Sequence, residues 1–91
     1  PIVSHAGDGN FHVALLIDKN SEEELKKLSD FLTRISERAI RMDGTCTGEH
    51  GVGQGKRKYM LKELGSAVDV MKQIKNAFDP KKIMNPGKLF L

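Results

Sequence analysis

Two glycine-rich segments constrain this chain most, because glycine favours sharp turns and interrupts helices and strands. The first covers residues 5–12 and reads HAGDGNFH. The second covers residues 44–55, where five of the twelve residues are glycine. All three histidines lie in these two segments, and Glu49 precedes the last of them. Imidazoles and carboxylates bind metals and move protons. The pattern therefore predicts two loops that build a site.

The rest of the sequence predicts an α+β fold. Apolar residues that alternate after Asn10 are typical of a strand, and Ser21 with Glu24 forms a capping box ahead of a helical apolar stripe. Two shorter helical patterns follow, separated by Gly65 and ended by Pro80. The predicted elements are one main strand over residues 10–18, three helices over residues 21–42, 56–64 and 66–78, and an extended tail over residues 83–91.

Helical spacing also predicts which side chains are buried. In the long helix they are Leu25, Leu28, Phe31, Leu32, Ile35, Ala39 and Ile40. In the last helix they are Ala67, Val70, Met71, Ile74, Ala77 and Phe78. Gly44 is predicted at the C′ position, where glycine commonly ends a helix.

Length and charge limit the classes of protein. The chain has 91 residues and begins with Pro1 rather than methionine, so we expect a fragment of a larger protein. One cysteine excludes an internal disulfide, and no apolar run approaches the ~20 residues of a membrane span. The net charge of +3 indicates a solvated helix face or attraction of anionic ligands. Only Tyr59 and Phe78 interleave with the cations, which disfavours nucleic-acid binding.

The glycine-rich loops do not match the common phosphate-binding motifs. Arg57 follows the only suitable Gly-Lys pair, where a Walker A motif requires serine or threonine. The dinucleotide fingerprint would require glycine at Lys56. A generic anion-binding nest stays open, but metal binding is the more specific hypothesis.

Two histidines and a carboxylate suffice for a catalytic divalent metal with open positions. A turn at residues 7–9 can bring His5 and His12 together, and Glu49 from the second loop can complete the set. Asp8 is either a further ligand or an acid that orients an imidazole. His50 has the side chain suited to taking a proton near neutral pH. The alternative is that all of these are turn residues and surface histidines.

Three other side chains of the second loop have weaker candidate roles. Cys46 is either a metal ligand or, as is common for a free thiol, buried and inert. Thr45 and Thr47 either bind a substrate carboxylate or cap the loop.

Residues 5–12, residues 44–53 and the tail sequence NPGK at residues 85–88 together resemble a known family. It comprises the FAD-linked 2-hydroxy-acid dehydrogenases of the vanillyl-alcohol-oxidase type. The D-lactate dehydrogenase (cytochrome) branch is most similar, and its relatives include D-2-hydroxyglutarate dehydrogenase and the glycolate oxidase D subunit. The resemblance implies that residues 1–91 are the C-terminal part of a substrate (cap) domain with an antiparallel sheet and helices on one side. Residues 83–91 would return to a flavin domain outside this chain.

The resemblance also implies roles for individual residues. His5, His12 and Glu49 would bind a divalent metal, Zn or Mn. His50 would contact the substrate and act as the base, and Asn85 would lie near FAD. The 2-hydroxyglutarate enzymes carry a polar residue where this chain has Ala14, so a smaller substrate such as D-lactate is expected.

The expected partners are a small 2-hydroxy acid and an electron acceptor such as a cytochrome or quinone, without nucleic acid or a transmembrane segment. Self-association of the fragment through its apolar faces is a further expectation. The location would be mitochondrial in a eukaryote, and cytoplasmic or peripheral to the inner membrane in a bacterium. Two alternatives stay open from the residues alone: a non-catalytic metal-binding module and a basic nucleic-acid-binding domain.

Overall fold

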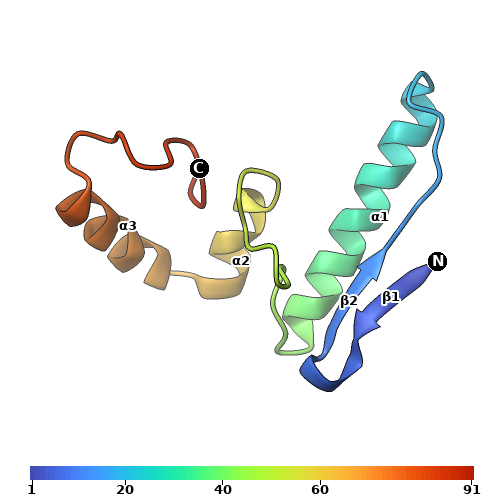
Figure 1. Cartoon of the computed structure of the whole chain (residues 1–91), viewed down its shortest axis with the longest axis horizontal. Coiled ribbons are helices and arrows are strands. Elements are labelled where there is room, and N and C mark those ends of the chain that lie inside the picture. The colour runs from blue at the N-terminus through green and yellow to red at the C-terminus, as the bar shows by residue number, and fades with distance from the viewer.

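The computed structural model describes residues 1–91 as a hairpin followed by one long and two shorter helices (Figure 1). The elements are β1 (Ile2–His5), the 3-10 turn η1 (Ala6–Asp8), β2 (Asn10–Val13), α1 (Glu22–Arg41), the 3-10 turn η2 (Arg57–Tyr59), α2 (Met60–Leu64) and α3 (Ala67–Phe78). The predicted α+β class and the three helices are confirmed, although the second helix, predicted over residues 56–64, is a 3-10 turn up to Tyr59 and α-helical only from Met60. None of the helices has the length and apolar composition required to cross a bilayer.

The sheet is an antiparallel pair in which β1 and β2 are joined through η1. The prediction of one strand over residues 10–18 was wrong in two ways. The first strand, β1, was missed, and β2 ends at Val13, which pairs with Ile2 at the start of β1. The Ala14 N–H donates to the Pro1 carbonyl at 3.0 Å, and residues 14–18 pair with no strand among residues 1–91. The apolar alternation therefore continues without a ladder, and Leu16 is 99% exposed.

Helix α1 begins with half of the predicted capping box. The Ser21 hydroxyl accepts from the Glu24 N–H at 3.3 Å, but the Glu24 carboxylate accepts from the Asp18 N–H at 2.6 Å, further back than the motif requires. This pair of contacts fixes both the first turn of α1 and the chain that enters it.

Helix α1 ends in a Schellman motif that corrects the predicted cap. Asp43, with φ 61°, occupies the left-handed C′ position that was predicted for Gly44. The Gly44 N–H donates to the Ala39 carbonyl at 2.8 Å, and the Asp43 N–H donates to Ile40 at 3.1 Å. A Cβ on Gly44 would lie 2.9 Å from the Ala39 carbonyl oxygen, so glycine is needed there for close approach.

Few residues are fully buried. The apolar ones are Cys46, Tyr59, Met60 and Val68, which lie in the second loop, at the start of α2 and on α3. The polar ones are Ser36 on α1 and Asp79 after α3. The predicted apolar stripes are less buried than expected: Leu25 and Leu32 on α1 are 41% and 44% exposed, and Phe78 on α3 is 82% exposed. A two-stranded hairpin is too narrow to cover a helix of 20 residues.

Two side-chain contacts fasten the α2 region to α1. The Tyr59 hydroxyl donates to Thr33 Oγ1 at 3.2 Å, and Lys62 on α2 forms an ion pair with Glu37. The Lys62 hydrogen bond lowers the pKa of the Glu37 carboxyl. Because α1 also ends at the second glycine-rich loop, these contacts fix both ends of the segment that carries the loop.

Candidate metal centre

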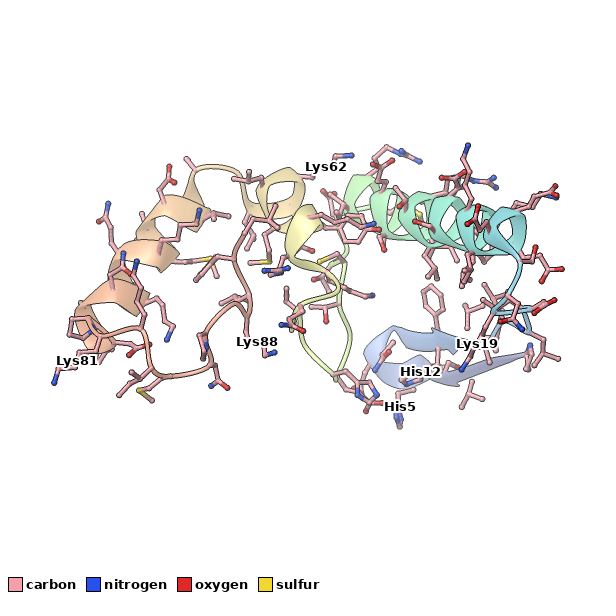
Figure 2. All side chains as sticks on the ribbon, turned by 90° about the horizontal axis from the view of Figure 1, so that it is seen from above. His5, His12, Lys19, Lys62, Lys81 and Lys88 are labelled. Atoms are coloured by element: carbon pink, nitrogen blue, oxygen red, sulfur yellow. The ribbon has the colours of Figure 1, made fainter.

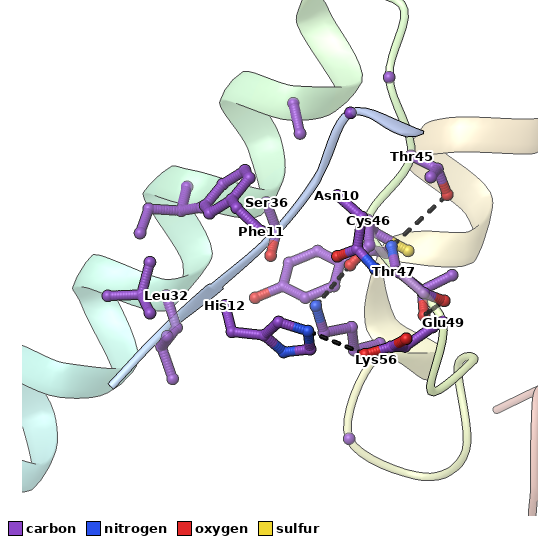
Figure 3. A pocket seen from close by; sticks show the side chains of 18 of the residues that line it. Asn10, Phe11, His12, Leu32, Ser36, Thr45, Cys46, Thr47, Glu49 and Lys56 are labelled. Atoms are coloured by element: carbon purple, nitrogen blue, oxygen red, sulfur yellow. Dashed lines mark hydrogen bonds and ion pairs between the residues drawn. The ribbon is translucent and has the colours of Figure 1, made fainter. Parts of the chain in front are cut away.

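The hairpin register brings the first two candidate ligands to one face. Val3 pairs with His12 and His5 pairs with Asn10, so all four side chains project from the same side of the sheet. His5 and His12 are therefore diagonal neighbours, with ring centroids 6.3 Å apart. Phe11 projects toward α1 and His12 points away from it (Figure 3).

Glu49 reaches the same face from the second loop. Its carboxylate oxygens lie 3.4 Å from His5 Nε2 and 2.9 Å from His12 Nε2. One ligand atom from each residue lies within 4.8 Å of the other two. Two ligands of a tetrahedral ion at ~2.1 Å would be about 3.4 Å apart. The set is therefore compact enough for one ion after small side-chain movements.

The centre is open to solvent on one side. The side chains of His5, His12 and Glu49 are 59%, 38% and 47% exposed. This exposure leaves room for further ligands, which a catalytic metal site requires. Figure 2 shows both histidines on the hairpin, in the half of the molecule away from Lys81.

His50 lies beside the three-residue group without joining it. Its Nε2 is 3.8 Å from a Glu49 oxygen, and its ring is nearly perpendicular to that of His12 at a centroid distance of 5.6 Å. The side chain is 82% exposed. An imidazole in this position can exchange a proton with a molecule bound at the centre.

A cavity of about 930 Å³ extends behind the centre between the hairpin and α1 (Figure 3). Its walls include the polar His12, Thr47 and Glu49 and the apolar Phe11 and Leu32. Candidate ligands and apolar side chains therefore line the same cavity, a combination common in small-molecule sites.

The supports of the second loop were not predicted from the sequence. The Glu63 carboxylate accepts from the Cys46 N–H at 2.7 Å, and Lys56 Nζ donates to the Cys46 carbonyl at 2.6 Å. Asn10 lies against Gly48, where an added Cβ would be 2.7 Å from the amide oxygen. The position of Asn10 inside the first motif was a usable signal, whereas nothing in the sequence linked Glu63 to Cys46.

The other candidates of the sequence analysis lie outside the ligand group. Asp8 ends the η1 turn and is not among the grouped donors. Cys46 is buried, and burial raises the pKa of its thiol, which suits the inert alternative. The Thr47 hydroxyl donates to Gly48 at 3.4 Å, and Thr45 accepts from the Thr47 N–H at 3.5 Å, so both cap the loop.

Asn85 lies in the C-terminal tail, apart from the centre. It is exposed and has φ 47°, a left-handed conformation that asparagine tolerates better than most residues. The tail returns to the second loop through one hydrogen bond, from the Leu89 N–H to the Gly53 carbonyl at 2.8 Å.

Comparison with known proteins identifies the family. Residues 2–89 match the family described as FAD linked oxidases, C-terminal domain. The chain is 56% identical over 90 residues to D-lactate dehydrogenase [cytochrome] 1, mitochondrial, of Saccharomyces cerevisiae, and 49% identical over 90 residues to a probable mitochondrial D-lactate dehydrogenase of Danio rerio. It is 45% identical over 87 residues to glycolate oxidase subunit GlcD of Bacillus subtilis.

The alignments cover nearly all of this chain and a small part of each relative. They include 98% of the chain for the yeast and zebrafish proteins and 94% for the bacterial one. The corresponding shares of the relatives are 15%, 18% and 18%. Because the family match extends over almost every residue, the chain belongs to the FAD-linked oxidases and represents their C-terminal domain.

Proposed function

We propose that this chain is the C-terminal part of an FAD- and divalent-metal-dependent dehydrogenase that oxidises a D-2-hydroxy acid, with D-lactate to pyruvate as the favoured reaction. The family match supports a flavin enzyme, and the names of the relatives support D-lactate or glycolate as the kind of substrate. Ala14, where a polar residue would suit a larger dicarboxylic substrate, favours lactate.

The observation that carries the proposal is the convergence of two histidines and one glutamate from separate segments. His5, His12 and Glu49 would hold the metal, for which Zn or Mn suits imidazole and carboxylate donors. When bound, the ion supplies Lewis-acid polarisation of the hydroxyl and carboxylate of the substrate. The partial exposure of the three side chains supports an open coordination site.

His50 is proposed as the base and as a contact for the substrate. It would accept the hydroxyl proton of the 2-hydroxy acid on a ring nitrogen while the C2–H bond breaks and the C2–O bond becomes a carbonyl. FAD supplies the acceptor for the hydride that leaves C2. The exposed ring, beside Glu49 and perpendicular to His12, is free to meet a substrate from the solvent side.

The tail residues 83–91 are proposed to return to the flavin domain, with Asn85 near FAD. The exposed polar side chain of Asn85 makes no hydrogen bond within the chain, which supports an external contact. The electron acceptor after the flavin is proposed to be a cytochrome or quinone, since three relatives, the yeast protein among them, carry cytochrome in their names. A mitochondrial location is proposed if the source is eukaryotic, as the names of those relatives state for them.

Metal titration of purified full-length protein tests the centre. We expect stoichiometric binding of Zn²⁺ or Mn²⁺, strong loss of binding in His12→Ala, and unchanged binding in Asp8→Asn. Asp8 is the matched control because it lies in the same motif but outside the ligand group. Equal binding by wild type and His12→Ala would overturn the metal assignment. Metal binding without oxidation of any D-2-hydroxy acid would favour the non-catalytic alternative.

A further inference from the structure

We infer that Glu63 and Lys56 are positioning residues for the metal ligand Glu49, because together they hold the backbone N–H and carbonyl of Cys46 in the loop that carries it. The inference rests on the proposed metal site and adds two residues to it that do not contact the metal. Both residues follow the loop in the sequence, so the loop is held in place by the segment on its C-terminal side.

The two charged side chains bind both backbone polar groups of Cys46. Glu63 Oε1 accepts from the Cys46 N–H at 2.7 Å, and Lys56 Nζ donates to the Cys46 carbonyl at 2.6 Å. Hydrogen bonds to charged partners are short and roughly twice as strong as neutral ones. Cys46 itself is 3% exposed, so water competes little for these groups. The two peptide groups that flank Cys46 are thus each fixed by one charged partner.

The two hydrogen bonds to Cys46 fix the backbone only a short distance before the proposed ligand Glu49. Gly44 is fixed to Ala39 by the Schellman hydrogen bond of 2.8 Å, and Cys46 is fixed by the two charges. Only Thr47 and Gly48 separate Cys46 from Glu49. A glycine-rich loop loses much conformational entropy when it is ordered. Ordering it before the metal arrives removes that cost from metal binding.

A neighbouring ion pair separates positioning from general stability. Lys62 precedes Glu63 on α2 and pairs with Glu37 on α1, so it fastens the same helix without touching the loop. If the role of Glu63 were only to hold α2 in place, removal of Lys62 would affect the metal site in the same manner. If Glu63 positions the loop, only its own removal will do so.

The experiment measures Zn²⁺ affinity by competition with a chelating dye in the full-length protein, with folding checked by circular dichroism. Loss of a group that orients a metal ligand typically costs about 10–100-fold in metal affinity, and Glu63→Ala should fall near the lower end, about 10-fold. Glu63→Gln keeps a carbonyl that accepts the Cys46 N–H and should recover most of the affinity. Lys62→Ala should bind Zn²⁺ as wild type does.

Lys56→Met provides an independent test that keeps the inference falsifiable if Glu63→Ala fails to fold. It removes the donor to the Cys46 carbonyl while retaining the length of the side chain, and we expect weaker Zn²⁺ binding with Lys56→Arg close to wild type. Wild-type affinity in Lys56→Met overturns the inference alone, and so does wild-type affinity in Glu63→Ala or an equal loss of affinity in Glu63→Ala and Lys62→Ala. A wild-type protein that binds no Zn²⁺ overturns the metal proposal on which it rests.

Discussion

The second glycine-rich loop and the C-terminal tail are both irregular, and each is held by one acid and one lysine. In the loop, Glu63 and Lys56 hold the peptide of Cys46. In the tail, the buried Asp79 carboxylate accepts from the N–H groups of Ile83 and Met84 at 3.0 Å each. Lys75 pairs with Asp79 at 2.6 Å and donates to the Met84 carbonyl at the same distance.

The loop and the tail differ in the contacts that their polar side chains make. The loop places Glu49 beside histidines of the same chain, so the three candidate ligands all come from residues 5–49. The tail holds Asn85 in an exposed, left-handed conformation, where its side chain meets no partner of its own chain. The held loop therefore brings its charged side chain to partners within the chain, whereas the held tail leaves its polar side chain exposed. Variants that act on only one of the two segments test this distinction.

The largest effects are expected from the two neighbours at the end of the loop. Glu49→Ala should reduce metal affinity and turnover together, because a ligand is lost with the Lewis acid that it holds. His50→Ala should reduce kcat by about 10²–10⁴-fold with metal content retained, because a base acts in proton transfer. Steady-state kinetics with D-lactate and metal analysis of each purified full-length variant provide the measurement.

The opposite pattern would reverse the assignment of these two residues. A metal-free His50→Ala protein beside a fully loaded Glu49→Ala protein would make His50 the ligand. Wild-type kcat/KM in both variants would mean that the glycine-rich loops are only structural.

An intermediate effect is expected at the contact between the loop and the hairpin. In Gly48→Ala, the new Cβ would meet the Asn10 amide oxygen at 2.7 Å and displace Glu49 from the histidines. Overpacking of this kind costs about 1–3 kcal/mol, which corresponds to at least about fivefold in Zn²⁺ affinity if the strain falls on the bound state. Titration calorimetry measures the change.

The chain offers both a control and a rescue for this substitution. A Cβ on Gly55 meets nothing within 4 Å, so Gly55→Ala should bind Zn²⁺ normally. Shortening Asn10 to alanine in the Gly48→Ala background should restore affinity by removing the clash. Failure of the double variant to recover would show that Gly48 acts through its backbone freedom instead.

The smallest effect on the metal centre is expected from the tail. Asp79→Ala should speed hydrogen exchange at Ile83 and Met84 and leave Zn²⁺ affinity unchanged, because the tail anchor and the ligand set share no residue. Asp69→Ala, which removes an exposed acid from the first turn of the same helix, is the control. A loss of metal affinity in Asp79→Ala would show that the tail and the loop are coupled through the Leu89–Gly53 hydrogen bond.

The tail anchor should also depend on pH in a defined direction. The hydrogen bond from Lys75, with those from Ile83 and Met84, holds the pKa of the Asp79 carboxyl below its usual range. A lowered folded-state pKa stabilises the anchor above the ordinary aspartate pKa of about 3.9. That stabilisation is lost as the pH falls through the folded-state value. Exchange at Ile83 should therefore become less protected at acid pH in wild type, beyond any loss seen in Asp79→Ala.

The sequence predicted those parts of the fold that depend on local signals. The capping serine before α1, the helical stripe and Gly65 after α2 each act within a few residues, and the helix bounds came out within two residues of the prediction for α1 and α3. Strand β1 was missed because four residues carry little periodicity, and β2 was drawn too long because its length depends on that partner.

The candidate ligands were visible in the sequence, whereas their supports were not. His5, His12 and Glu49 stand out by residue type and by their glycine-rich surroundings. The bond between Glu63 and the Cys46 peptide joins residues 17 positions apart and uses a backbone group that leaves no trace in the sequence. The half-buried stripes of α1 and α3 have a similar cause, because burial depends on what packs against a helix as well as on its own periodicity.

The pairing of Val3 with His12 and of His5 with Asn10 means that the number of residues between the two histidines decides whether they share a face of the sheet. Side chains on a strand change face at every step, so a slip of one residue in the pairing would turn His5 toward α1 while His12 stayed outside. Substitutions in the connection at residues 6–9 should therefore disturb the site less than a change in the number of its residues. Inserting a single alanine between Gly7 and Asp8 would disrupt the site more than replacing either residue, although it removes no ligand, because it shifts the strand pairing by one residue. The length of the turn thus fixes the register that places both histidines on one face.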